Sequence, residues 1–62
     1  MDKEKIKQIR EKALLTQSEF AKILNISFAT IQSWERTNNV VPSFRMQRKI
    51  IEFCKNNDIK IG

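Results

Sequence analysis

Two helix-start signals lie about three helical turns apart along the chain, and this spacing limits the fold more than any other feature. Thr16 and Glu19 form a capping box, in which each side chain can bind the other residue's backbone amide, and Ser27 is the next suitable cap. Between them, Asn25 tolerates the left-handed conformation that ends a helix. The sequence therefore predicts two short helices, the second running to about Arg36. Because only about three residues join them, the two helices must cross steeply.

Apolar spacing predicts one further helix on each side of this pair. The first covers residues 2–14, with Asp2 as its cap, and the last opens at Pro42 and Ser43 and runs to about residue 55 or 56. We therefore predict an all-α fold, a compact bundle of four to five helices with the closely spaced pair at about 17–36. The residues expected to face inward are Ile6, Ile9, Ala13, Phe20, Ala21, Leu24, Ile26, Ile31, Trp34, Met46, Ile50, Phe53 and Cys54.

The sequence provides residues neither for a disulfide or metal cross-link nor for catalysis. With one Cys and no His, an internal disulfide is impossible and a zinc site is disfavoured, so stability must come from helix packing. Cys54 lies among apolar residues and is expected to be a buried thiol without a base partner. No Gly-rich phosphate loop or carboxylate pair appears. We expect no enzyme activity, no cofactor, no metal and no small-molecule ligand.

Length and apolar runs predict one soluble domain. The chain of 62 residues is expected to form a single domain, 1–62, with its core at about 3–56 and a short tail at 57–62. No apolar run approaches the roughly 20 residues that cross a bilayer. The opening stretch MDKEKIKQIR lacks the apolar centre of a signal peptide, so we expect no membrane partner and a cytoplasmic location.

The charge balance favours a polyanionic partner. The net charge is +5 and the sequence pI is about 9.8. Such an excess attracts DNA, RNA or an acidic membrane, and by itself it does not choose among them.

The closely spaced helix pair resembles the Cro- and phage-repressor-type (XRE) helix-turn-helix family through the run Gln17-Ser18-Glu19-Phe20-Ala21 … Leu24-Asn25-Ile26-Ser27 … Thr30-Ile31 … Trp34-Glu35-Arg36. The similarity covers roughly residues 5–54. It implies a lambda-repressor-like bundle, encoded by a bacterium or a phage, whose helix at 27–36 enters the major groove of double-stranded DNA. It also implies a structural pair between Arg10 and Glu35, in which a guanidinium fork binds a carboxylate. The alternative is that both are ordinary surface charges.

The face of the 27–36 helix that points away from the core predicts base contacts. Once Ile31 and Trp34 face inward, the remaining outer residues include no acid, so this face can approach phosphates without repulsion. Gln can bind adenine through two hydrogen bonds, Ser can bond to several base edges, and apolar side chains can pack on thymine methyl groups. The expected base contacts, which also match the resemblance, are Phe28, Ala29, Gln32 and Ser33. Phe28 has an alternative role as a core or dimer residue.

Phosphate contacts are expected on either side of these residues. Gln17 starts a helix, where backbone amides favour an anion, and the resemblance implies a phosphate there. The full set of expected phosphate contacts is Gln17, Ser27, Arg36, Asn38, Asn39, Ser43 and Arg45. Each has the alternative of being an ordinary solvated side chain. Such contacts position a protein on DNA, whereas base contacts specify the sequence.

The chain departs from the family pattern at helix ends. Leu14 and Thr37 stand where the family usually has Gly, and Asn25 often replaces Gly as well. We therefore expect the ends near 14 and 37 to be built differently from those of the family. Thr37 would be strained in a left-handed turn, so the loop that carries Asn38 and Asn39 is expected to deviate from that of the family.

The leading hypothesis is a transcriptional regulator, expected to be a repressor, that binds double-stranded DNA as a homodimer on a two-fold symmetric site. The alternative is a protein-interaction module, such as the antitoxin of a toxin–antitoxin pair, which would tolerate acids on the outer face of the third helix. The apolar residues expected either to join two subunits or to cover the core are Phe44, Ile51, Ile59 and Ile61.

Overall fold

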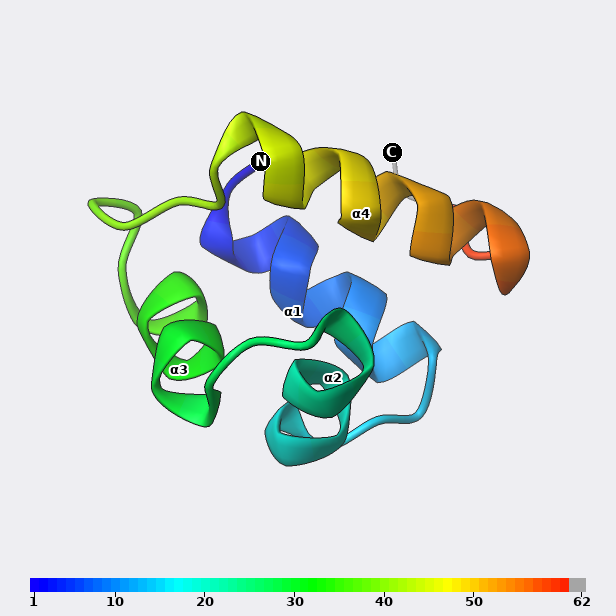
Figure 1. Cartoon of the computed structure of the whole chain (residues 1–62), viewed down its shortest axis with the longest axis horizontal. Coiled ribbons are helices and arrows are strands. Elements are labelled where there is room, and N and C mark those ends of the chain that lie inside the picture. The colour runs from blue at the N-terminus through cyan, green and yellow to red at the C-terminus, as the bar shows by residue number, and fades with distance from the viewer. Residues whose placement is uncertain (61–62) are drawn as a thin grey trace.

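The computed structural model describes residues 1–60, which form four helices and no strand (Figure 1). The helices are α1 (Lys3–Lys12), α2 (Gln17–Leu24), α3 (Phe28–Arg36) and α4 (Phe44–Asn56). In Figure 1, α1 runs between α4 on one side and the α2–α3 pair on the other. The all-α bundle predicted from the sequence is confirmed, with four helices. Within residues 1–60, no helix has the length and apolar character needed to cross a bilayer.

Each helix begins after a side chain that caps its first amides, and the sequence predicted this cap for α1, α2 and α3. The last helix begins at Phe44, just after the predicted opening at Pro42 and Ser43. In α2 the capping box is complete, because the Glu19 amide donates to Thr16 Oγ1 at 3.1 Å and the Thr16 amide donates to Glu19 Oε1 at 2.8 Å. These bonds satisfy backbone donors that have no partner inside the helix. The four caps are Asp2, Thr16, Ser27 and Ser43.

Three turns at helix ends use a left-handed residue that is not glycine. These residues are Leu14, Asn25 and Asp58, with φ of 59°, 58° and 56°. The amide of the next residue bonds back to a carbonyl in the last helical turn, which is the hydrogen bond of a Schellman motif. The three bonds are Leu15 N to Arg10 O at 3.1 Å, Ile26 N to Ala21 O at 2.9 Å and Ile59 N to Cys54 O at 2.9 Å.

Two expectations about the end of α1 are wrong, namely that the helix reaches residue 14 and that its end differs from the glycine-type turn of the family. The helix predicted over residues 2–14 ends at Lys12, because Leu14 leaves the helical conformation for the left-handed one. This end is therefore a left-handed turn of the kind that glycine usually makes, formed here by leucine. The end of α3 differs from the left-handed turn of the family, as expected, because Thr37 has a φ of −146°, which is extended backbone and avoids the strain of such a turn.

The core is one cluster of buried apolar residues to which all four helices contribute. Full burial of one such apolar side chain stabilises the fold by about 1.5–3 kcal/mol. The rings of Phe20 and Phe53, 5.3 Å apart and tilted by 54°, join α2 to α4. Lys49 of α4 also donates to the Leu24 carbonyl at 3.2 Å, which places a cation at the end of α2. The buried core residues are Ile6, Ile9, Phe20, Ala21, Leu24, Ile31, Trp34, Ile50 and Cys54.

The apolar residues that the sequence left without a role separate into two kinds. Ile59 packs against the core, whereas Phe44 and Ile51 are exposed, with 78% and 45% of their surface accessible. Ile61 lies outside the described residues. Phe44 and Ile51 are therefore available for a contact with another molecule, and Ile59 is part of the fold.

Candidate nucleic-acid interface

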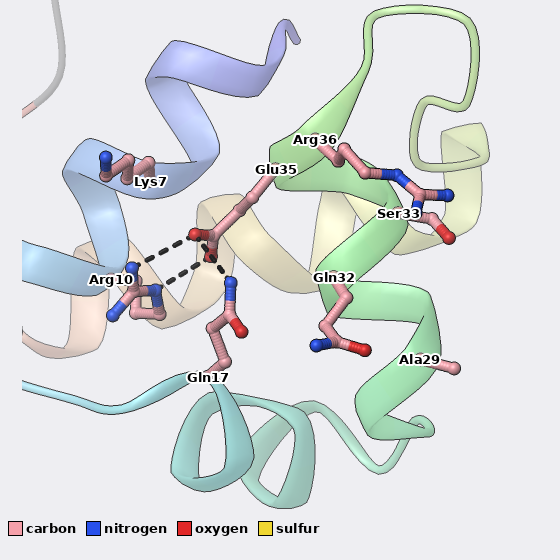
Figure 2. Close-up of a pocket in the computed structure, with 8 residues that line it drawn as sticks. All are labelled: Lys7, Arg10, Gln17, Ala29, Gln32, Ser33, Glu35 and Arg36. Atoms are coloured by element: carbon pink, nitrogen blue, oxygen red, sulfur yellow. Dashed lines mark hydrogen bonds and ion pairs between the residues drawn. The ribbon is translucent and has the colours of Figure 1, made fainter.

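The outer side of α3 is free of acidic side chains because its only acid, Glu35, turns inward. Ile31 and Trp34 are buried in the core, and the Glu35 side chain is only 6% exposed. Ala29, Gln32 and Arg36 are exposed, and Ser33 is half-buried. Figure 2 shows Ala29, Ser33 and Arg36 along one side of α3, with Gln32 extending over the space in front of Gln17. This arrangement leaves a polar and basic ridge facing solvent.

A cleft of about 560 Å³ lies between α1 and this ridge. The N-terminus of α2 closes one of its ends, where Gln17 points toward Glu35 (Figure 2). The residues that line it are Lys7, Arg10, Gln17, Ala29, Gln32, Ser33, Glu35 and Arg36. Three helices therefore contribute to one surface that includes three of the four expected base contacts, Ala29, Gln32 and Ser33.

Glu35 is held by a network that joins three helices. Arg10 Nε donates to Glu35 Oε2 at 2.7 Å, and Arg10 Nη2 donates to Glu35 Oε1 at 3.0 Å. Gln17 Nε2 also donates to Glu35 Oε1, at 3.1 Å. A two-point guanidinium–carboxylate pair fixes both distance and orientation. The network therefore fixes how α1 and the start of α2 lie against α3.

Arg10 also ties down the turn between α1 and α2. Its Nη1 donates to the Leu15 carbonyl at 2.9 Å, immediately after the left-handed Leu14. The hydrogen bond to Glu35 is the main cause that raises the pKa of Arg10, against a smaller opposing effect of burial. The guanidinium stays charged, and the negative charge of the Glu35 carboxylate balances it.

The four residues expected to contact bases lie at or near the outer side of α3. Phe28 is the first residue of the helix and is 44% exposed, so it is not part of the core. Ala29, Gln32 and Ser33 follow it along the cleft. The structure therefore brings these residues together on one surface, whereas Phe28 stands at its end and does not line the cleft.

The residues expected to contact phosphates are more widely spread. Only Gln17 and Arg36 line the cleft, and the side-chain amide of Gln17 is already bonded to Glu35. The Ser27 hydroxyl binds Thr30, through the Thr30 amide at 3.3 Å and the Thr30 hydroxyl at 2.8 Å. The others lie in the loop after α3 and at the start of α4, namely Asn38, Asn39, Ser43 and Arg45. Asn38 accepts a hydrogen bond from the Lys3 amide at 2.9 Å, which ties that loop to α1.

Lys7 is the cleft residue that the sequence analysis missed. It precedes Arg10 by one helical turn, so the two share a face of α1, and both line the cleft. The sequence held one signal for this position of Lys7. Arg10 was expected to pair with Glu35 of α3, so the face of α1 that carries Arg10 and Lys7 could be expected to lie against α3.

Comparison with known proteins agrees with this geometry. The model of the helix-turn-helix family HTH_3 matches residues 6–56, which is most of the chain. No curated protein and no solved structure matches. The matched region contains all of α2, α3 and α4, the cleft and the Arg10–Glu35 pair. The resemblance stated from the sequence is confirmed, and the chain belongs to the HTH_3 helix-turn-helix family of the XRE/Cro type, whose domain binds DNA.

Proposed function

We propose that this chain is a sequence-specific transcriptional repressor that inserts α3 into the major groove of double-stranded DNA. The observation that supports the proposal best is the inward turn of Glu35, which leaves the exposed side of α3 polar and basic. A groove bordered by phosphates repels an outward carboxylate and attracts such a surface. The net charge of +5 acts in the same direction.

Base reading is assigned to the outer side of α3. Gln32 is exposed beside the cleft and can form two hydrogen bonds with adenine. Ser33 can bond to several base edges, and Ala29 and Phe28 can pack on thymine methyl groups. Because Phe28 is in the first turn of α3 and 44% of its surface is accessible, it can reach the bases where the helix would enter the groove.

Phosphate contacts are assigned to both sides of the helix. Gln17 holds Glu35 through its side chain, so its free backbone amide at the start of α2 is the group left to bind a phosphate. Arg36, at the end of α3, contacts the backbone on the other side. The remaining assigned contacts are Ser27, Asn38, Asn39, Ser43 and Arg45.

A homodimer is proposed on DNA. The domain is 27 Å in its longest dimension. Two adjoining copies can therefore place their α3 helices one DNA turn apart, about 34 Å, on a two-fold symmetric site. Phe44 and Ile51 are exposed and apolar and are the proposed subunit contacts. The proposed location is the cytoplasm, where a DNA-binding regulator of a bacterium or a phage acts.

A selection of bound duplexes from a random pool tests the proposal. We expect a short enriched sequence in two inverted halves spaced about one helical turn apart. Affinity for the enriched duplex is expected to fall steeply as salt rises, because phosphate binding releases counterions. Enrichment of no sequence, together with binding that does not respond to salt, contradicts the proposal and favours a protein-interaction module instead.

A further inference from the structure

We propose that Lys7, on α1, binds a phosphate of the DNA backbone at the α1 side of the cleft while the outer side of α3 occupies the groove. This inference rests on the proposed DNA binding and adds a contact from a helix outside the helix-turn-helix. It assigns Lys7 a positioning role, in which it holds the backbone that borders the groove and reads no base.

The charges that line the cleft support this assignment. Arg10 is only 15% exposed on its side chain, and both oxygens of Glu35 accept hydrogen bonds from it, so this pair has little net charge to offer. Lys7 and Arg36 are exposed, and neither forms an ion pair with any residue between 1 and 60. The positive charge available to a polyanion in the cleft therefore comes from Lys7 and Arg36.

The positions of these two cations match the two borders of a groove. Arg36 lies on α3 beside Ser33, whereas Lys7 lies on α1 across the cleft from that helix (Figure 2). A helix lying in the major groove has a phosphate backbone on either side of it. Lys7 is therefore placed to meet the backbone on the α1 side. A long, flexible ammonium side chain suits a phosphate as a point charge.

Lys5 provides a matched control on the same helix. It is an exposed lysine two residues away, which places it about 200° around the helix axis from Lys7. It does not line the cleft. Replacing either lysine removes the same charge from α1, so any difference between the two variants reports position. Glu4 and Glu11, one turn before and after Lys7, are unchanged in both variants.

The experiment is a salt titration of Lys7→Gln, Lys5→Gln and wild type on a mixed-sequence duplex of about 20 base pairs, two turns of DNA. Loss of one phosphate contact lowers the slope of log affinity against log salt by about 0.9. From about 50 to about 200 mM salt, wild type is thus expected to lose about 3.5-fold more affinity than Lys7→Gln. Lys5→Gln is expected to keep the wild-type slope, and Lys7→Arg to restore it.

The outcomes separate this inference from the proposed function. If wild type binds with steep salt dependence and the two glutamine variants share one slope, the Lys7 assignment is overturned and the proposed function stands. If wild type shows no salt-dependent binding, the proposed function fails and the assignment fails with it. If Lys7→Gln weakens only a selected duplex and leaves the mixed one unchanged, Lys7 reads a base, and the phosphate role is overturned.

Discussion

Arg10 and Glu35 join α1 to α3 through two hydrogen bonds, 2.7 Å from Nε to Oε2 and 3.0 Å from Nη2 to Oε1. The pair sits below the exposed ridge of α3, with the carboxylate 6% exposed. It therefore removes the acid of α3 from the proposed DNA surface and also fixes the position of α1, which carries Lys7. We therefore expect both the stability of the fold and the proposed DNA binding to depend on this contact.

Arg10→Met is expected to lower the free energy of unfolding by about 3 kcal/mol, because it leaves a nearly buried carboxylate with Gln17 as its remaining side-chain donor. The double variant Arg10→Met with Glu35→Met is expected to recover most of this loss, since no unpaired charge remains. Urea unfolding followed by circular dichroism measures both values. Arg45→Met, which removes an exposed cation, is the control and is expected to change stability by less than about 0.5 kcal/mol. Equal stability of wild type and Arg10→Met contradicts the role of the pair.

Leu14→Gly is expected to stabilise the fold. Leu14 is held at a φ of 59° and is 90% exposed, so the wild-type side chain is strained and buries little. Glycine removes the strain of the left-handed backbone, which costs about 1 kcal/mol. Part of this gain is lost because glycine also has greater conformational freedom in the unfolded chain. The net gain of about 0.5 kcal/mol is expected to raise Tm by a few degrees.

Leu14→Ala is the matched control for this gain. It removes the same exposed apolar surface but keeps a Cβ atom, so the backbone strain remains. Thermal unfolding of the three proteins side by side is the measurement. If Leu14→Ala gains as much stability as Leu14→Gly, exposure of the leucine side chain, and not its left-handed backbone, accounts for the effect.

Glu19→Gln is expected to change how stability depends on pH. Hydrogen bonds from the Thr16 backbone amide and side chain lower the pKa of Glu19 below its ordinary value of 4.5. A carboxyl group whose pKa is lower in the folded state stabilises that state above its unfolded pKa, and this contribution is lost as pH falls through the folded pKa. The stability gap between wild type and Glu19→Gln should therefore be full at neutral pH and narrow below about pH 4.5. Thermal unfolding at several pH values measures it, and a gap that stays constant down to pH 3 contradicts the capping role.

The helix starts could be predicted because they depend on residues within one helical turn. The features that the sequence did not predict depend on contacts between residues that are farther apart. The caps Thr16 and Ser27 act within one helical turn, so the printed sequence was enough to find them. The end of α1 was placed too late because its apolar pattern continues to Ala13, while the turn is fixed by the Leu15 carbonyl accepting from Arg10. Propensity alone does not place leucine at a positive φ.

The candidate site was likewise predictable only where it depends on local spacing. The outer side of α3 followed from the spacing of Ile31 and Trp34, which are buried as expected. The inward orientation of the Gln17 side chain and the place of Lys7 in the cleft both depend on how far α1 and α2 lie from α3. Those distances are set by tertiary packing, which no short-range pattern in the sequence encodes.

Gln32→Ala is expected to weaken binding to a selected duplex by about 1–3 kcal/mol and to relax the preference at one base pair. The reason is the exposed position of Gln32 beside the cleft, where its amide can form two hydrogen bonds with an adenine. The measurement is a comparison of affinities for the selected duplex and for the duplexes that carry each other base pair at that position. Gln47→Ala is the control. The Gln47 side chain donates to the carbonyl of Pro42, just before α4, at 3.1 Å, and it does not line the cleft. A uniform loss on every duplex gives Gln32 a positioning role and removes it from the base-reading set.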